Sequence, residues 1–287
     1  MMSENDKEKK RPPLCLAIHD ICTYAKSSLT VVIPVMEALG VEVCPLPAAV
    51  LSSQIDGFDD YYHMDLLDST RKIAACLRNE QIRFDCIYSG FLSTPQLAYY
   101  IKGIRSLAKP DALIAVDPVL GDNGRLYSSF QPDMVEAVRL LIEDADLMKP
   151  NWTEGCLLTN TPYEENPSDS QVMKVLEKLH DIAPHADISM TGVSLSGSSK
   201  PRCDIACFDA SDSSVWSYSH AREPESLPGS GDFFCSVMIS SILSGMSFPD
   251  AVKEAGNQTR KCIRLTSKAG FERRHGICTS LWIRSGR

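Results

Sequence analysis

Short hydrophobic runs alternate with amphipathic stretches along most of the chain. Runs with the length of buried strands occur at residues 14–18, 84–89 and 113–116. Between them, apolar positions recur with helical spacing at residues 69–80 and 95–107. Strands and helices that alternate in this way predict a mostly parallel sheet with helices on both faces.

The same pattern predicts the remaining elements. Further strands are expected at residues 41–46, 147–149 and 188–191, and further helices at residues 29–39, 134–142, 152–158, 168–182, 231–243 and 249–266. Residues 203–208 and 215–219 alternate polar and apolar side chains, which predicts an antiparallel hairpin late in the chain. Residues 47–67, with several aspartates around Gly57, favour an irregular loop.

Length and composition fit one large α/β domain. The chain has 287 residues, of which 44% are hydrophobic, and no repeat, low-complexity run or linker divides it. We therefore expect a single domain at residues 14–287. Residues 1–13 are polar, charged and end in two prolines, so we expect a disordered tail there.

Charge and thiol content limit the classes of partner and compartment. A formal net charge of −8 and a pI near 5.3 argue against binding to nucleic acid or to an anionic membrane. No apolar run is long enough to span a bilayer, and the N-terminus lacks a signal-peptide core. The eleven cysteines include no CxxC pair, which favours reduced thiols in a cytoplasmic protein over disulfides or a zinc site.

The stretch from Gly229 to Asp232 is the strongest candidate for chemistry. It opens a charge-free helix, so Gly229, Ser230 and Gly231 would present backbone N–H groups to an anion at the helix N-terminus. Asp232 would then act as a general base that takes the proton from a hydroxyl group attacking a phosphoryl group. The alternative is an aspartate that caps a helix after a glycine turn.

Two further constellations follow predicted strands. Asp117 and Asp122 lie five residues apart on one loop, which suits a Mg²⁺ ion that bridges phosphate oxygens, but Asp, Asn and Gly are also ordinary turn residues. Asn151 and Glu154 suit the phosphates and the water shell of the metal, or alternatively a capping box at a helix start. Spacing alone leaves these alternatives open.

Other nucleotide-binding motifs are incomplete. Residues 192–200 are similar to a P-loop, but Ser198 replaces the lysine, and we interpret residues 197–200 as a flexible turn. No GxGxxG motif follows the first predicted strand, and no nucleophile elbow supports a hydrolase triad.

Eight segments of the chain match, in order, the motifs of one known family. They are Ala17-Ile18-His19-Asp20-Ile21, Ser28-Leu29-Thr30-Val31, Ala49-Val50-Leu51-Ser52, Tyr88-Ser89-Gly90-Phe91-Leu92, the loop from Val116 to Tyr127, Pro150-Asn151-Trp152-Thr153-Glu154, Thr191-Gly192-Val193 and Gly229-Ser230-Gly231-Asp232. Together they resemble the pyridoxal (vitamin B6) kinase branch of the ribokinase superfamily. The resemblance implies a ribokinase-like, three-layer α/β/α fold with a central, mostly parallel sheet.

The resemblance also implies an activity and a set of site residues. It implies an ATP-dependent pyridoxal kinase that phosphorylates the 5′-hydroxymethyl group of pyridoxal, pyridoxine or pyridoxamine. The implied residues are Asp232 as base, Gly229, Ser230 and Gly231 as anion hole, Asp117, Asn151, Glu154 and Thr191 for ATP and its phosphates, Asp117, Asp122 and Glu154 for the metal, and Asp20, Ser52, Phe91 and Asp232 for the substrate. Mg²⁺, a monovalent cation such as K⁺ and a homodimer complete the expectation.

The chain departs from the B6 kinase pattern in three places. Gln54 and Ile55 stand where a histidine and a threonine are usual after Ser52. Lys149 replaces an uncharged residue beside the phosphate region, and Ser230 replaces a threonine. Two alternatives therefore stay open: a hydroxymethylpyrimidine kinase of thiamin synthesis, and a non-catalytic homologue that binds a B6 vitamer or a nucleotide.

Overall fold

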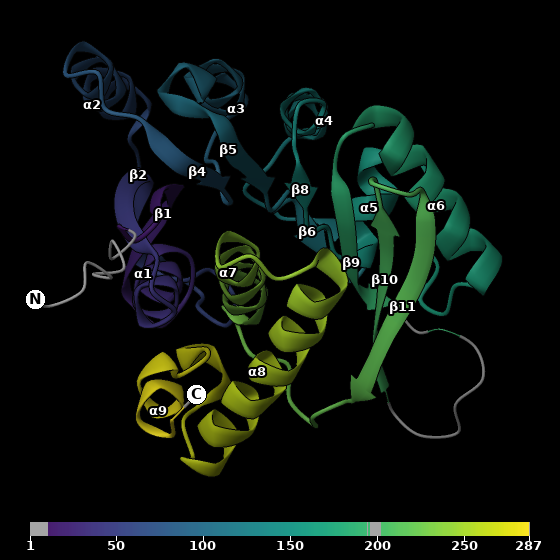
Figure 1. Ribbon diagram of the computed structural model, residues 1–287. Helices are drawn as coiled ribbons and strands as arrows, with labels where there is room; N and C mark the ends of the chain where they lie inside the picture. Colours follow the sequence, from purple (N-terminus) through teal and green to yellow (C-terminus); the bar gives the residue numbers. More distant parts are fainter. Residues whose placement is uncertain (1–10, 194, 196–201, 287) are drawn as a thin grey trace, which may run out of the picture.

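The computed structural model describes residues 11–193, 195 and 202–286, and within them nine strands form one sheet (Figure 1). The strand order across it is β11-β10-β9-β8-β5-β4-β1-β2-β3. The bounds of these strands are β1 Leu14–Tyr24, β2 Glu42–Ser53, β3 His63–Asp65, β4 Phe84–Ser89, β5 Ala108–Val116, β8 Leu147–Met148, β9 Asp187–Val193, β10 Arg202–Asp209 and β11 Ser214–Ala221. A separate small pair consists of β6 (Gly121–Asp122) and β7 (Arg125–Leu126).

The sheet is mostly parallel, as predicted. The strands from β2 through β1, β4, β5 and β8 to β9 pair in parallel. At one edge β10 runs antiparallel to β9 and forms a hairpin with β11, and at the other edge the short β3 runs antiparallel to β2. The predicted late hairpin is therefore confirmed.

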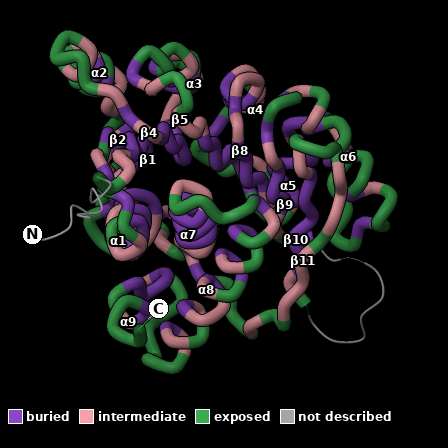
Figure 2. The backbone as a smooth tube through the Cα atoms, in the orientation of Figure 1, coloured by how far each residue is buried: buried purple, intermediate pink, exposed green. Residues whose placement is uncertain are grey.

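Helices cover both faces of the sheet (Figure 1). They are α1 Leu29–Ala38, α2 Leu67–Asn79, α3 Pro95–Lys102, α4 Asp133–Ile142, α5 Trp152–Leu158, α6 Asp169–Ile182, α7 Ser230–Leu243, α8 Phe248–Lys268 and α9 Thr279–Arg284, with 3-10 turns at Gly103–Leu107 and Arg273–His275. One buried cluster joins the sheet to α2 through α6, and a second joins it to α1, α7, α8 and α9. Figure 2 shows the central strands and α7 as the most buried part of the chain. The predicted three-layer α/β/α fold is confirmed.

Two strands extend beyond their predicted ends. β1 continues past residue 18 to Tyr24, and β2 continues through residues that the sequence favours as irregular, up to Ser53. The two strands stay paired as far as Tyr24 and Ser53, with a register shift after His19, and β3 adds a further pairing to β2. Pairing on both sides satisfies the backbone of β2 despite its two prolines, and this tertiary effect is not visible in local composition.

Residues 1–10, 194 and 196–201 lie outside the described residues, so most of the predicted tail and the predicted turn at 197–200 stay predictions. All eleven cysteines are described, and each is a free thiol. Among the described residues, no helix combines the length and apolar character needed to cross a membrane.

Candidate active site

Helix α7 begins at the carboxyl ends of the parallel strands, where ligands bind in open α/β sheets. Its N-cap, Gly229, has φ +79°, and a Cβ there would lie 2.5 Å from the Lys26 carbonyl oxygen, so only glycine fits. The Ser230 hydroxyl donates to the Leu227 carbonyl at 2.6 Å. In the first turn, the N–H groups of Gly231 and Asp232 have no intrahelical acceptor and are suited to an anion.

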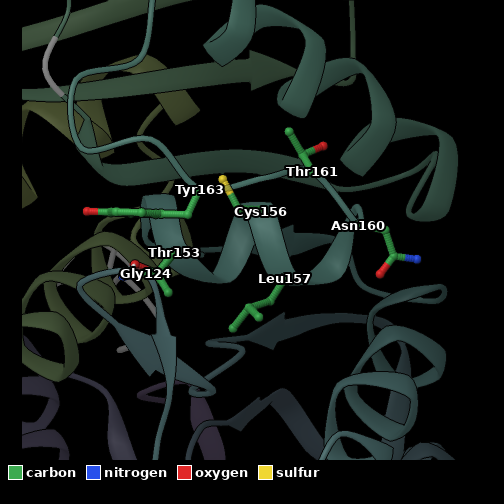
Figure 3. A pocket seen from close by; sticks show the side chains of 7 residues that line it. All are labelled: Gly124, Thr153, Cys156, Leu157, Asn160, Thr161 and Tyr163. Atoms are coloured by element: carbon green, nitrogen blue, oxygen red, sulfur yellow. Dashed lines mark hydrogen bonds between the residues drawn. The ribbon is translucent and has the colours of Figure 1, made fainter.

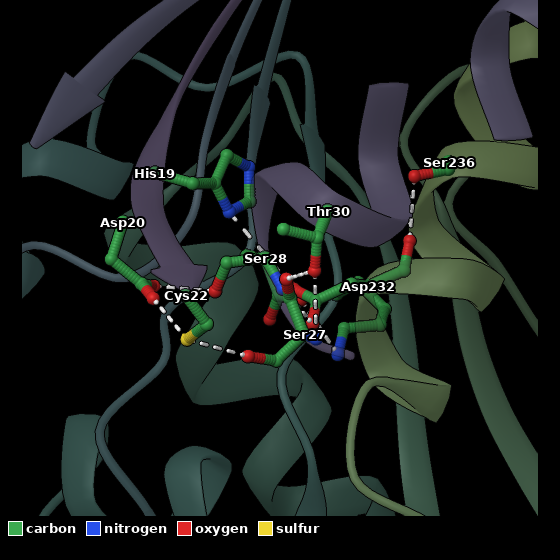
Figure 4. Close-up of polar contacts among 10 residues, drawn as sticks. His19, Asp20, Cys22, Ser27, Ser28, Thr30, Asp232 and Ser236 are labelled. Atoms are coloured by element: carbon green, nitrogen blue, oxygen red, sulfur yellow. Dashed lines mark hydrogen bonds and ion pairs between the residues drawn. The ribbon is translucent and has the colours of Figure 1, made fainter. Parts of the chain in front are cut away.

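The Asp232 carboxylate is fixed by the start of helix α1 (Figure 4). Its Oδ2 accepts a hydrogen bond from the Ser28 N–H at 2.8 Å, and the side chain is 13% exposed. Burial, and then the charge of Asp117, raises the pKa of Asp232 to about 7. A carboxyl group with this pKa can accept a proton near neutral pH. An aspartate with an ordinary pKa would also be ionised at that pH.

Ser28 joins this aspartate to a second one. Its hydroxyl donates to Asp20 Oδ1 at 2.5 Å, and the Cys22 thiol donates to Asp20 Oδ2 at 3.1 Å. Ser28 itself has φ +50°, an uncommon conformation for a residue with a side chain. Ser28 thus bonds Asp20 through its hydroxyl and Asp232 through its backbone N–H.

His19 lies next to Asp232 but does not form an ion pair with it. Its Nδ1 is 3.9 Å from Asp232 Oδ1, and both ring nitrogens are buried without a hydrogen-bond partner. Burial, and then the charge of Lys149, lowers the pKa of His19 to about 3, so the ring is neutral. Gly90 makes room for it, since a Cβ there would lie 2.0 Å from the ring.

A buried ion pair lies beside the α7 N-terminus. Lys149, directly after β8, places its Nζ 2.9 Å from Asp117 Oδ2, directly after β5. Both side chains are almost fully buried. A Cβ on Gly231 would lie 2.9 Å from the Lys149 Nζ, so the ammonium group rests against the backbone of the proposed anion hole.

Asn151 and Glu154 form the capping box that was one of the two alternatives. Glu154 Oε2 accepts from the Asn151 N–H at 2.7 Å, and Asn151 Oδ1 accepts from the Glu154 N–H at 2.9 Å. Glu154 Oε1 also accepts from the Leu120 N–H, and the Asn151 side chain donates to the Gly121 carbonyl. Burial, followed by Asp117, raises the pKa of Glu154 to about 8. These two side chains therefore hold the 117–124 loop in place.

The carboxylates fit a cation that is held mainly by phosphate oxygens and water. Within the described residues, no group of three or more His, Cys, Asp or Glu side chains forms a protein metal cage. Asp122 is exposed and accepts from the N–H of Asn123, and both Glu154 oxygens are engaged. Asp117 Oδ1, in contrast, is buried without a partner. Because Mg²⁺ in phosphate sites uses one or two carboxylates and keeps several waters, this donor set fits it.

The remaining predicted residues have contacts of their own. The exposed Ser52 hydroxyl accepts from the Tyr62 N–H at 2.8 Å. Phe91 stacks on Phe130 with ring centroids 5.4 Å apart. Thr191 pairs with Asn151 through an isolated parallel bridge, which places it beside the start of α5. Among the predicted residues, Asp20 is linked to Asp232 through Ser28, Asp117 to Gly231 through Lys149, and Asn151 directly to Glu154.

A pocket opens beside α5 and the 121–124 loop (Figure 3). It is lined by Gly124, Thr153, Cys156, Leu157, Asn160, Thr161 and Tyr163. The Thr153 hydroxyl accepts from the Gly124 N–H at 2.9 Å, and Gly124 has φ +74° under the Tyr163 ring. The pocket therefore adjoins the loop predicted to face the ATP phosphates.

Known proteins resemble this chain over most of its length. Residues 33–278 match the phosphomethylpyrimidine kinase family. A pyridoxine/pyridoxal/pyridoxamine kinase of Bordetella bronchiseptica is 24% identical over 270 residues, which cover 89% of this chain and 90% of that protein.

Solved structures are similar over almost the whole length. A putative phosphomethylpyrimidine kinase from Bacteroides thetaiotaomicron, crystallised with pyridoxal, is 34% identical with a TM-score of 0.88, covering 96% of this chain and 95% of that one. A pyridoxal kinase from Lactobacillus plantarum is 26% identical with a TM-score of 0.86, covering 95% and 96%. The predicted resemblance to B6 kinases and the ribokinase-like fold are confirmed, and the chain belongs to the phosphomethylpyrimidine kinase family.

Proposed function

We propose that this protein transfers the γ-phosphoryl group of ATP to the 5′-hydroxymethyl group of pyridoxal, pyridoxine or pyridoxamine. The observation that supports this most directly is the Asp232 carboxylate at the N-terminus of α7, oriented by the Ser28 N–H. The B. thetaiotaomicron relative was crystallised with pyridoxal, and the B. bronchiseptica relative is named for all three vitamers. Both support a B6 vitamer as the acceptor.

In this proposal, each part of the site has one task. Asp232 takes the proton from the hydroxymethyl group as its oxygen attacks the γ-phosphorus. In the anion hole of Gly229, Ser230 and Gly231, the Ser230 N–H already donates to the Leu227 carbonyl, so the free Gly231 N–H, with that of Asp232, stabilises negative charge on the transferred group. Asp117 and Glu154, with Asp122 at the loop, would hold Mg²⁺, which neutralises phosphate charge when bound. Asn151 and Thr191 would contact the nucleotide, and Asp20, Ser52 and Phe91 the acceptor.

A second candidate acceptor is hydroxymethylpyrimidine or its phosphate, because the matching family is named for phosphomethylpyrimidine kinase. Both acceptors carry a hydroxymethyl group on a flat nitrogen heterocycle, so the same base and anion hole would serve. A monovalent cation such as K⁺ and a homodimeric, cytoplasmic enzyme remain part of the proposal.

The test is phosphate transfer from Mg·ATP to pyridoxal, pyridoxine, pyridoxamine and hydroxymethylpyrimidine. Asp232→Asn should lower kcat by about 10²–10⁴-fold, as expected for loss of a general base, and leave ATP binding nearly unchanged. Asp250→Asn is the matched control, since Asp250 occupies the same position in the first turn of α8. That variant should keep full activity.

The outcomes separate the candidates. Turnover on a B6 vitamer that disappears in Asp232→Asn supports the proposal, and turnover on hydroxymethylpyrimidine alone replaces it with the second candidate. Equal turnover by wild type and Asp232→Asn contradicts the role of Asp232. No turnover on any acceptor, with ATP still bound, favours the non-catalytic alternative.

A further inference from the structure

Lys149 is a buried, charged side chain beside the site, and the proposed mechanism gives it no task. Only 5% of the residue is exposed, and its ammonium group touches Asp117 Oδ2 at 2.9 Å. An ammonium group has three N–H donors, and this contact accounts for one of them. Burial of a lysine is costly unless the charge is paired or used.

The position of the ammonium group points to the transferred phosphate. Nζ lies against Gly231, whose own backbone is exposed at the start of α7. Since Gly231 has no side chain, nothing of it stands between Nζ and an anion bound at the α7 N-terminus. Glycine at position 231 therefore leaves room for the Lys149 ammonium group as well as for an anion close to the backbone.

The charges around the site need a cation at this place. Lys149 acts electrostatically on the carboxyl groups of Asp117, Glu154 and Asp232. Each of these groups repels an incoming phosphate when it is ionised, and a fixed positive charge beside them reduces that repulsion. A preorganised cation is also most effective where negative charge develops during transfer.

We propose that Lys149 is a catalytic residue, whose ammonium group contacts the γ-phosphoryl group beside the Gly231 N–H throughout the transfer. This inference rests on the proposed kinase function but not on the identity of the acceptor. The acceptor oxygen forms a bond to the γ-phosphorus, the bond to the ADP oxygen breaks, and the hydroxyl proton goes to Asp232. Lys149 keeps its proton and supplies only charge and hydrogen bonds.

Two substitutions test this role, each alone and in combination. Lys149→Met removes the charge and keeps a flexible side chain of similar length. Gly231→Ala keeps the charge but displaces Nζ, because the new Cβ would lie 2.9 Å from it and only the end of a flexible side chain has to move. Lys109→Met is the control, since it removes the lysine of another Asp–Lys pair, with Asp85, near the start of β4.

Two measurements are made on each variant: kcat, and the ratio of the Kd values for ADP and for a non-hydrolysable ATP analogue. Lys149→Met should lower kcat by about 10²–10³-fold, as for loss of one transition-state donor. It should also reduce the preference for the analogue over ADP by about tenfold, the value of one charged hydrogen bond. In the double variant, the effect of Gly231→Ala should be largely absent, because both changes act on one contact.

A purely structural role for Lys149 predicts no change in the ratio of the two Kd values. If Lys149 only neutralises Asp117, folded Lys149→Met will bind the analogue and ADP in the wild-type ratio, which would overturn the proposal. If Lys149→Met does not fold, Gly231→Ala decides: an unchanged ratio and kcat overturn the proposal as well. Failure of the wild type to phosphorylate any B6 vitamer contradicts the proposed function instead, since the binding ratio involves no acceptor.

Discussion

Ser28 shows how a single residue can orient two aspartates of the candidate site. Its N–H is bonded to Asp232, its hydroxyl is bonded to Asp20, and its φ of +50° stores backbone strain at this place. Strained residues of this kind persist where the surrounding structure fixes them, often at functional sites. The two aspartates therefore keep their positions relative to one another without a direct contact.

The ionisation of Asp232 makes a prediction about stability. The pKa of Asp232 is about 7 in the folded protein against an ordinary 3.8, so the folded state holds this proton more tightly than the unfolded chain. The contribution of Asp232 to the free energy of unfolding must then fall as pH rises from about 4 to about 7, by up to about 4 kcal/mol. The amide introduced by Asp232→Asn does not titrate and can still accept from the Ser28 N–H. We therefore expect this variant to exceed the wild type in stability at pH 8 but not at pH 4.

Urea unfolding of both proteins at pH 4, 6 and 8 measures this difference. Asp250→Asn serves again as control, because hydrogen bonds from Ser247, and then Lys253, lower the pKa of the exposed Asp250. Its loss should decrease stability at pH 8, the opposite sign. A pH-independent difference between wild type and Asp232→Asn would contradict the burial of this charge. The same ionisation predicts that kcat/KM increases as pH rises through about 7.

The sequence identifies some of these residues and cannot identify others. Asp232 and the glycines before it form a local pattern, and the structure places them at a helix N-terminus as predicted. The bond from Ser28 to Asp232 crosses 204 positions of the chain, and no local pattern encodes it. Lys149 is visible only as an unusual charge, and its contact with Gly231 requires the fold.

At the scale of elements, the boundaries of α7 and β2 show the same contrast. Helix α7 is predicted at residues 231–243 and found at Ser230–Leu243, because its apolar run and terminal glycines are local signals. Strand β2 is much longer than predicted, since its second half depends on neighbours β1 and β3. Local signals thus predict the helix that carries Asp232 better than the strand that carries Ser52.

The two glycines that flank α7 allow a matched test of the helix start. Gly229 and Gly245 both have positive φ, +79° and +95°, but a Cβ on Gly245 meets nothing within 4 Å. Gly245→Ala should therefore cost only about 1–2 kcal/mol from the left-handed conformation and keep full activity. Gly229→Ala adds the clash with the Lys26 carbonyl, so it should lose more stability and most of kcat.

Thermal unfolding and steady-state kinetics of these two variants measure the difference. Equal losses of stability in the two variants would mean that the backbone at Lys26 moves away from the new methyl group at little cost in free energy. Unchanged kcat in Gly229→Ala would contradict the role of this turn in placing the anion hole.

At the scale of the whole molecule, three distant segments meet around the site. The Lys26 N–H donates to the His275 carbonyl, and the Ile277 N–H donates to the Pro228 carbonyl, both at 2.9 Å. Gly276 has φ +78°, and a Cβ there would lie 2.4 Å from the Lys26 carbonyl oxygen. The end of the chain therefore holds the starts of α1 and α7 together, and with them Ser28 and Asp232.

The segment after β2, residues 54–58, contacts the C-terminal loop at residues 272–276. Buried Gln54 donates to the carbonyl groups of Asp56 and Arg274, and Arg273 pairs with Asp56 at 2.7 Å. The Arg274 guanidinium lies over the Phe58 ring. Gln54, one of the departures from the B6 kinase pattern, thus has a structural partner that the sequence alone does not reveal.

Gln54→Ala removes both hydrogen bonds and should make residues 54–58 more mobile. The resemblance places this segment at the acceptor, so nucleotide binding should not change. If the lost hydrogen bonds cost about 1 kcal/mol of acceptor-binding free energy, KM for the acceptor should increase about fivefold. The Kd for ADP should stay unchanged. Hydrogen exchange at residues 54–58 and 272–276 should become faster together, because each segment is held by the other. Gln171→Ala is the control, since Gln171 caps the distant helix α6 at the surface. Faster exchange in only one segment, or equal KM in both variants, would show that Gln54 does not couple the C-terminal loop to acceptor binding.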